Sequence, residues 1–356
     1  MSQNLKILVV GQGLAGSVLA HQFIQKGFHV KIIDKGHQGI SSSLAAGVVN
    51  PVTGRRIVKS WMIDELLPVA KSYYQAIEKE LGLKLWYELP ALRLFTDTGM
   101  SNNWSIRMTN EGYEHYLDFA QAKTIARFPI KNEFGVGLIK HSARANISMM
   151  IESFRKKWLQ EGRLSEATFQ HDRLEGATYQ GEDYDRIIFC EGWEAMHNPL
   201  FQSLPFQVTK GEVLILHLPE MPEENIIKKK VAFIPLGDHL FWAGATNFWD
   251  FEDAEPSKEG ETWLKTEIEA ILDQTYEVVR HLAAIRPTVR HRRPMIGFPK
   301  NLEANQKEPR IGIFNGFGTK GTSLVPYWAQ QFTNAVAHSS GLPADVDVNL
   351  KIKSQR

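Results

Sequence analysis

Short apolar runs bounded by glycines alternate with amphipathic stretches along most of this chain. Residues 5–10 are apolar apart from Lys6, which is typical of a buried strand. Residues 17–26 carry apolar side chains at helical spacing and stop at Gly27. Residues 28–33 predict a second strand, which ends in Asp34. The N-terminal segment is therefore predicted to form a strand–helix–strand unit.

The same patterns divide much of the remaining chain into helices and strands. Helical spacing predicts helices over 62–81, 145–162, 259–272 and from Gly321 to about His338. Strands are predicted over 164–171, 177–180, 185–190, 206–218, 231–235, 240–246 and 310–314. Residues 85–140 give no clear pattern, and the polar tail from Ala344 predicts a loosely held terminus. The order is α/β, antiparallel β and again α/β.

The turn between the first strand and helix has the G-x-G-x-x-G pattern of Gly11, Gly13 and Gly16. Gly11 permits the tight turn, Gly13 lets backbone approach a pyrophosphate, and Gly16 lets the helix pack on the strand. Asp34 would accept hydrogen bonds from a ribose. Because the same acid would repel the additional phosphate of NADP, the unit predicts a site for NAD or FAD.

A second glycine loop, Gly316-Phe-Gly318-Thr-Lys-Gly321, precedes the last predicted helix. The residues that follow contain no strand ending in an acid, so they do not complete a second dinucleotide unit. We interpret the loop as a turn whose N–H groups face a ligand, with a helix N-terminus that stabilises negative charge on a reduced ring. A turn without a ligand is the alternative.

The amino-acid composition and charge limit which kinds of binding partner and bound group the chain can be expected to have. The 356 residues suggest two domains, or one large domain with an insert. With 41 Lys and Arg against 40 Asp and Glu, the chain has no overall attraction to nucleic acid or anionic membranes. No run approaches the ~20 apolar residues of a membrane span, so we expect a cytoplasmic location. The single cysteine, Cys190, excludes a disulfide framework, and no metal-binding motif is present.

Further motifs occur in a fixed order after the first glycine loop. They are the segments 41–47, 190–193, 210–213, 242–246, 285–287 with 293–297, and 314–321. Together with the N-terminal unit, they resemble the D-amino-acid oxidase, glycine oxidase and sarcosine oxidase family of FAD flavoproteins. The resemblance implies noncovalently bound FAD and oxidation of the C–N bond of a small amino acid or secondary amine, by hydride transfer to flavin N5.

The predicted fold class is α/β plus α+β, a Rossmann-like FAD-binding domain with an inserted antiparallel-sheet substrate domain. We expect residues 1–85, 141–205 and 291–356 to form the FAD-binding domain. Residues 86–140 and 206–290 would then form the substrate-binding domain.

The resemblance and the glycine motifs together supply candidate site residues. Arg286 is expected to bind the substrate carboxylate, and Lys320 is the second catalytic candidate. The substrate-pocket candidates are Asn50, Arg55, Trp242 and Asn247. The FAD-binding candidates are Gly11, Gly13, Leu14, Ala15, Gly16, Asp34, Lys35, Ser42, Ser43, Ala46, Gly47, Gly192, Trp193, Gly316, Phe317, Gly318, Thr319, Lys320 and Gly321.

Two basic stretches, 55–59 and 286–293, depart from the family pattern. They motivate one alternative, a flavoprotein acting on a modified tRNA base that bears an amine, although the near-neutral net charge argues against a nucleic-acid partner. A non-catalytic or electron-transfer flavoprotein is the other alternative. The electron acceptor (oxygen, a quinone or a protein) and the oligomeric state are left open by the sequence.

Overall fold

A computed structural model describes residues 4–36, 41–300, 302 and 309–353. One of its two large sheets has six strands in the order β11-β2-β1-β15-β22-β21. The bounds are β1 Lys6–Val10, β2 His29–Asp34, β11 Leu164–Glu166, β15 Arg186–Phe189, β21 Met295–Gly297 and β22 Ile311–Asn315. All neighbouring pairs are parallel except β21–β22. The predicted strand–helix–strand unit is confirmed at its centre.

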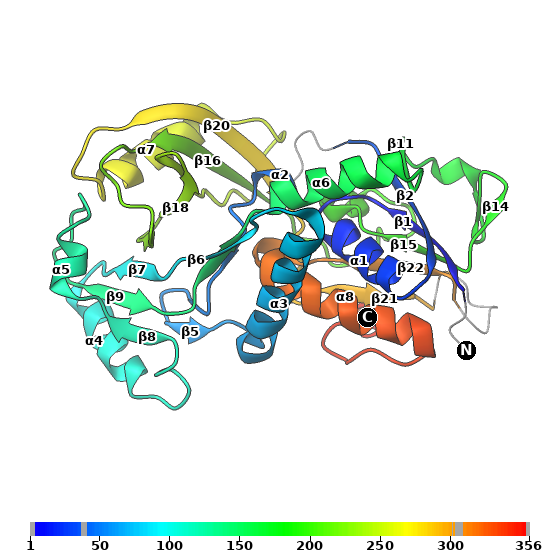
Figure 1. The fold of residues 1–356 in the computed structure, drawn as a ribbon, viewed down its shortest axis with the longest axis horizontal. Coiled ribbons are helices and arrows are strands. Elements are labelled where there is room, and N and C mark those ends of the chain that lie inside the picture. Colours follow the sequence, from blue (N-terminus) through cyan, green and yellow to red (C-terminus); the bar gives the residue numbers. More distant parts are fainter. Residues whose placement is uncertain (1–3, 37–40, 301, 303–308, 354–356) are drawn as a thin grey trace.

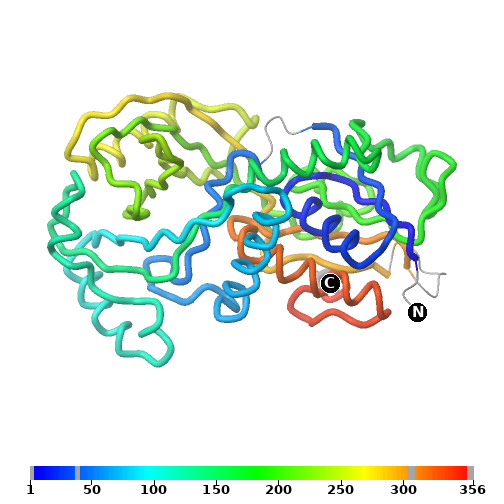
Figure 2. Tube along the Cα trace, viewed as in Figure 1, coloured from blue at the N-terminus to red at the C-terminus, as the bar shows by residue number. Residues whose placement is uncertain are grey.

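Four longer helices accompany this sheet: α1 Leu14–Gln25, α3 Ile63–Leu81, α6 Ile147–Gln160 and α8 Gly321–His338. Helix α1 packs between the sheet and α8, so that the C-terminal segment lies beside the N-terminal one (Figures 1 and 2). Their boundaries follow local signals. The Asn146 side chain accepts a hydrogen bond from Met149 N at the start of α6, and Gly82 ends α3 with a left-handed φ of 66°.

The second large sheet has eight strands in the order β20-β16-β19-β18-β17-β7-β9-β8. The bounds are β7 Ala91–Leu94, β8 Leu117–Phe119, β9 Val136–Ile139, β16 Thr209–His217, β17 Ile226–Lys228, β18 Ala232–Gly237, β19 Leu240–Gly244 and β20 Glu277–Arg286. The expected antiparallel sheet is in fact mixed, because β17 and β7 pair in parallel. Helix α7, Lys258–Glu269, has Ser257 as its N-cap and begins one residue before the predicted helix 259–272.

The remaining elements are short. They are α2 Ser41–Leu44, β3 Val48–Val49, β4 Val52–Thr53, β5 Val58–Lys59, β6 Trp86–Glu88, α4 Thr98–Met108, α5 Ala122–Ile125, β10 Ala143–Ala145, β12 Leu174–Glu175, β13 Thr178–Tyr179, β14 Glu182–Asp183 and α9 Val348–Lys353. The tail is held better than predicted, because Val346 and Val348 are fully buried. The proposed division into two discontinuous domains stays a prediction. Among the described residues, no helix is long and apolar enough to cross a membrane.

Candidate active site

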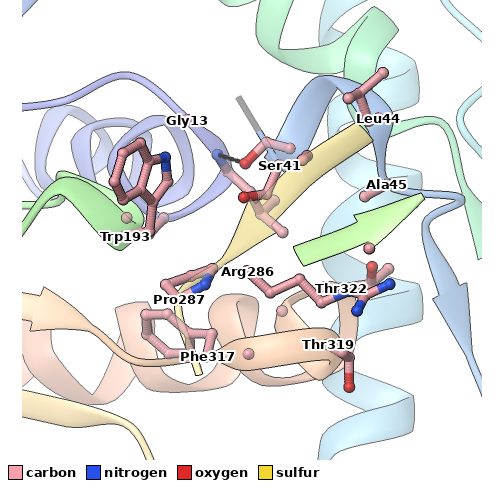
Figure 3. A pocket seen from close by; sticks show the side chains of 18 of the residues that line it. Gly13, Ser41, Leu44, Ala45, Trp193, Arg286, Pro287, Phe317, Thr319 and Thr322 are labelled. Carbon is pink, nitrogen blue, oxygen red and sulfur yellow. Dashed lines mark hydrogen bonds between the residues drawn. The ribbon is translucent and has the colours of Figure 1, made fainter. Parts of the chain in front are cut away.

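A cavity of about 1030 Å³ runs from the first glycine loop to the eight-stranded sheet. In Figure 3, Trp193 lies at the Gly13 end of the cavity and Arg286 extends across its middle. Most of the predicted site residues line this space. Those that do are Gly11, Gly13, Leu14, Ala15, Asp34, Lys35, Ser42, Ala46, Gly47, Asn50, Gly192, Trp193, Trp242, Asn247, Arg286, Phe317, Gly318, Thr319, Lys320 and Gly321.

Four predicted site residues lie outside the cavity lining: Gly16, Ser43, Arg55 and Gly316. Arg55 is exposed in the turn after β4, so the structure does not place it in a substrate pocket. Gly16 acts through packing, because a Cβ there would lie 1.8 Å from the carbonyl oxygen of Gly11. Gly316 has a φ of 81°, a backbone conformation that favours glycine, and so permits the turn of the second loop without lining the cavity.

The carboxylate of Asp34 is held rigidly at the end of β2. It accepts hydrogen bonds from Gln12 N at 2.7 Å and from Gly36 N at 2.8 Å. Arg155 in α6 also donates to it, at 2.8 Å. Lys35 next to it forms an ion pair with Glu194 at 2.6 Å. Asp34 is therefore pre-positioned at the cavity wall.

The start of α1 provides room and charge for a phosphate. The N-cap residue of α1 is Gly13, which has no side chain to cap the helix. The first turn of α1 contains no acidic residue. Ser42 accepts a hydrogen bond from Leu14 N at 3.0 Å, and a Cβ on Gly13 would come within 3.1 Å of that same hydroxyl. A helix N-terminus approached through a glycine suits a pyrophosphate, so these residues fit a dinucleotide.

The cavity-facing side chains of the eight-stranded sheet alternate along each strand. Ile226 and Lys228 of β17 and Ala232 and Ile234 of β18 line the cavity, whereas Phe233 between them lies in the core. The pattern continues across the sheet with Gly211, Val213, Trp242, Gly244, Leu282, Ala284 and Arg286. One face of the sheet thus forms a wall of the cavity.

Arg286, at the end of β20, points its guanidinium into this space. It donates to the Thr246 carbonyl from Nη1 at 3.1 Å and from Nη2 at 3.2 Å, and to Asn247 Oδ1 at 3.3 Å. Among the described residues it has no carboxylate partner, and burial lowers its pKa. Arginine keeps its charge in proteins even where burial lowers its pKa. The Arg286 guanidinium is therefore a positive group, held in a fixed orientation, that an anionic ligand can bind.

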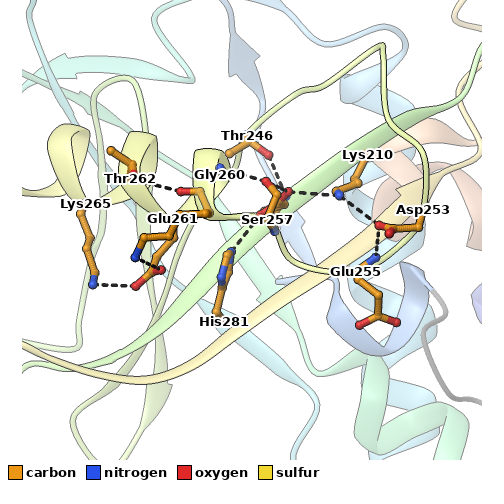
Figure 4. Close-up of polar contacts among 12 residues, drawn as sticks. Lys210, Thr246, Asp253, Glu255, Ser257, Gly260, Glu261, Thr262, Lys265 and His281 are labelled. Carbon is orange, nitrogen blue, oxygen red and sulfur yellow. Dashed lines mark hydrogen bonds and ion pairs between the residues drawn. The ribbon is translucent and has the colours of Figure 1, made fainter.

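A buried network on the other face of the sheet holds Thr246 in place (Figure 4). The carbonyl of Thr246 in turn accepts from Arg286. Glu212 is fully buried, and its N–H donates to Thr246 Oγ1 at 2.8 Å. The Glu212 carboxylate accepts from Ser257 N at 2.9 Å and from Ser257 Oγ at 2.7 Å. Lys210 Nζ lies 3.4 Å away from it. The Glu212 carboxylate thus joins β16 to the start of α7, while the Glu212 backbone N–H holds Thr246 just after β19.

Comparison with known proteins gives the family. The family model of FAD-dependent oxidoreductases of the D-amino-acid oxidase type matches residues 6–335. The chain belongs to this family. It is an FAD-dependent oxidoreductase with a Rossmann-like nucleotide fold, as the sequence motifs predicted.

Individual relatives agree with this assignment. The chain is 24% identical over 323 residues to a glycine oxidase of Pseudomonas aeruginosa, covering 82% of this chain and 85% of that protein. Its fold is similar to iminodiacetate oxidase from Chelativorans sp. BNC1, with a TM-score of 0.74, 20% identity and coverage of 95% and 97%. It is also similar to glycine oxidase from Geobacillus kaustophilus, with a TM-score of 0.75, 16% identity and coverage of 95% and 96%.

Among the cavity residues of this flavoprotein that sequence reasoning did not select, Glu191 and Lys228 are ionisable groups whose pKa is strongly shifted by burial. Lys228 precedes two further lysines, and such a run is usually solvated. Its pKa falls to about 8 because of burial first and then the charges of Arg93 and Lys320. The period-2 pattern of Ile226 and Lys228 could have identified it, but only once residues 226–228 were recognised as a strand.

Lys320 of the flavoprotein lies where the second glycine loop enters α8. Its Nζ is 3.3 Å from Ser60 Oγ, and burial together with Arg293 and Arg292 lowers its pKa. Arg293 itself stacks on Trp61 at 4.2 Å. Part of the basic stretch is therefore engaged within the chain.

Glu191 follows β15 and lines the cavity near Trp193. Asn198 Nδ2 donates to its carboxyl at 2.7 Å, and burial raises its pKa from 4.5 to about 7. In the unfolded chain this carboxyl ionises near pH 4.5, whereas in the folded protein it keeps its proton up to about pH 7. The free energy of unfolding therefore falls as the pH rises through this window.

We expect Glu191→Gln to remove that pH dependence. The variant should match the wild type near pH 5 and exceed its free energy of unfolding at pH 8, by up to about 3 kcal/mol. The amide oxygen of Gln can still accept from Asn198. Denaturant unfolding at several pH values measures the effect, and parallel pH profiles for the two proteins would contradict it.

A second variant tests the positioning of Arg286. A Cβ on Gly211 would lie 1.8 Å from Arg286 Nη2. Because the guanidinium ends a flexible side chain, Gly211→Ala should fold and keep FAD while displacing this group. We expect flavin reduction by substrate to fall about 10- to 100-fold, since misplaced binding groups cost that much. Stopped-flow absorbance measures it, and an unchanged rate and substrate Kd would show that the guanidinium does not position substrate.

Proposed function

We propose that this flavoprotein oxidises the C–N bond of a small amino acid or secondary amine that bears a carboxylate. The observation that carries the proposal is the Arg286 guanidinium, which lines the cavity without a carboxylate partner among residues 4–36, 41–300, 302 and 309–353. Arginine binds a carboxylate through two parallel hydrogen bonds and so fixes its orientation. A substrate held in this way presents its amine-bearing carbon in a defined direction.

The protein's part in such a reaction is binding and orientation. FAD, which the two glycine loops would hold, would supply a two-electron acceptor for the hydride of the substrate. The neutral amine lone pair assists as the hydride leaves the adjacent carbon, the N–H proton goes to solvent, and the C–N single bond becomes an imine that water can hydrolyse. Arg286 would hold the carboxylate, and Trp242 and Phe317 would form apolar walls that exclude water.

Relatives support this reaction class. The names of two of them specify glycine and iminodiacetate, both of which combine an amine with carboxylate groups. The near-neutral net charge gives the chain no overall attraction to tRNA, and Arg55 of the first basic stretch is exposed and does not line the cavity. A small amino-acid substrate is therefore the better supported of the two.

Anaerobic flavin reduction tests the proposal directly. The FAD-loaded enzyme is mixed with glycine, sarcosine, proline, D- and L-amino acids and amines that lack a carboxylate. We expect bleaching of the oxidised flavin by amino acids only, and reoxidation under air or by an artificial acceptor then identifies the oxidant. A flavin that dithionite reduces but no amine reduces would favour an electron-transfer protein instead.

A further inference from the structure

A cluster of positive charge occupies a part of the cavity away from Arg286. Lys228 of β17 lines the cavity and is the direct cross-strand partner of Arg93 in β7. The two side chains also line a small internal pocket together. Lys320, from the second glycine loop, is close enough to lower the pKa of Lys228. Two lysines of the cavity lining, Lys228 and Lys320, therefore lie near each other, and Arg93 adds a third positive charge beside Lys228 from the small neighbouring pocket.

This cationic cluster has no neutralising acid within the described parts of the chain. Lys228 has no hydrogen-bond or ion-pair partner there, Arg93 donates to the Lys229 carbonyl at 2.8 Å, and Lys320 reaches only Ser60 Oγ. The acidic residues of the cavity, which are Asp34, Glu191 and Glu194, all belong to its nucleotide end. Like charges on paired strands destabilise a sheet, and buried unpaired charges cost more still. An anionic ligand would relieve both costs.

Lys228, at the centre of the cationic cluster, and Arg286 are separate binding points. Three strands, β16, β19 and β18, lie between β20 with Arg286 and β17 with Lys228. Neighbouring strands are spaced about 4.8 Å apart, so a single carboxylate does not reach both groups. A ligand that satisfies both must carry two anionic groups joined by a chain of several atoms.

We propose that the substrate is dianionic: an amino acid whose side chain or N-substituent ends in a second carboxylate, bound by Lys228 with Arg93 and Lys320 around it. This assignment rests on the proposed function, because Arg286 is taken to hold the first carboxylate. It adds a substrate class that should be preferred over neutral amino acids. The second carboxylate anchors the substrate and leaves the reacting carbon between the two anchored ends.

Binding of unreactive acids tests the proposal without relying on catalysis. Adipate and hexanoate have the same carbon number but two and one carboxylates, as do glutarate and pentanoate. Each is titrated into the FAD-loaded enzyme, with the flavin absorbance change and the thermal midpoint as readouts. We expect the diacid of each pair to bind about tenfold tighter or more, since each well-formed buried charge pair has an effect of this size. Equal binding of both acids of a pair would overturn the proposal.

The matched variants are Lys228→Met and Lys229→Met, which remove the same charge from adjacent positions. Lys229 does not line the cavity. We expect Lys228→Met to abolish the preference for diacids and to leave monoacid binding unchanged, while Lys229→Met keeps the preference. Equal weakening of diacids and monoacids by Lys228→Met would instead indicate a single anion site, and a retained preference would remove Lys228 from the site. Either result overturns the proposal.

Flavin reduction separates this proposal from the proposed function. The enantiomers of 2-aminoadipate and 2-aminohexanoate are compared as reductants. A preference for 2-aminoadipate that disappears in Lys228→Met supports both the proposed function and the dianionic substrate class. Equal reduction by the two amino acids keeps the proposed function and overturns the dianionic class. Tight diacid binding without reduction by any amine keeps the second anion site and overturns the proposed function.

Discussion

Replacing Arg286 with methionine is expected to lower the second-order rate constant of flavin reduction by amino acids roughly 30- to 3,000-fold. The guanidinium is the charged group that the Thr246 carbonyl and Asn247 orient into the cavity. Its loss leaves the substrate carboxylate without a partner in a partly desolvated site. Lysine at this position keeps the charge but not the two-pronged geometry, so we expect an intermediate loss. Stopped-flow reduction over a range of substrate concentrations separates the effect on Kd from that on the limiting rate.

Arg290→Met is the matched control for this experiment. Arg290 belongs to the same basic stretch but is exposed and lies outside the cavity lining. FAD content should be unchanged in both variants, because Arg286 lies on the substrate side of the cavity. An Arg286→Met enzyme that keeps the wild-type Kd and limiting rate would show that the carboxylate binds elsewhere.

Gly16→Ala is expected to yield a destabilised protein that purifies without FAD. The added Cβ would lie 1.8 Å from the Gly11 carbonyl oxygen and 3.3 Å from the Cys190 Cβ. Both backbone segments are held by the parallel sheet, so neither can yield without moving the loop that faces the cavity. We expect the free energy of unfolding to fall by about 3 kcal/mol, as in severe overpacking. The flavin absorbance per protein and denaturant unfolding measure the two effects.

Two further alanine variants serve as controls that assign the effect of Gly16→Ala to the close packing at Gly16. Gly341 is exposed with no atom near its Cβ position, and Gly341→Ala should change stability by no more than about 0.5 kcal/mol. At Gly13 the nearest atom is Ser42 Oγ at 3.1 Å, which can rotate away. We therefore expect Gly13→Ala to fold normally and to bind FAD more weakly. A fully loaded Gly16→Ala protein would contradict the packing role of this glycine.

Parts of the fold could be predicted from the sequence because local residue patterns determine local structure there. The first strand–helix–strand unit was predictable because a buried parallel strand, a glycine turn and an amphipathic helix each leave a signal within a few residues. The start of α7 at Ser257 was predictable for the same reason, since the N-cap hydroxyl accepts from Gly260 N three residues on. The strands of 85–140 were not predictable, because they are three or four residues long and most of their partners lie far away in the chain.

The sequence alone determined the dinucleotide-binding unit, the family and the candidate role of Arg286, because these depend on residues adjacent in the chain or in a fixed motif order. Only the tertiary structure decided which charges enter the cavity. It excluded Arg55 from the cavity and added Lys228, which pairs with Arg93 from a strand more than a hundred residues away. A side chain's face is set by strand register and by the parallel β17–β7 pairing. That register is a property of long-range contacts, which no local pattern of residues records.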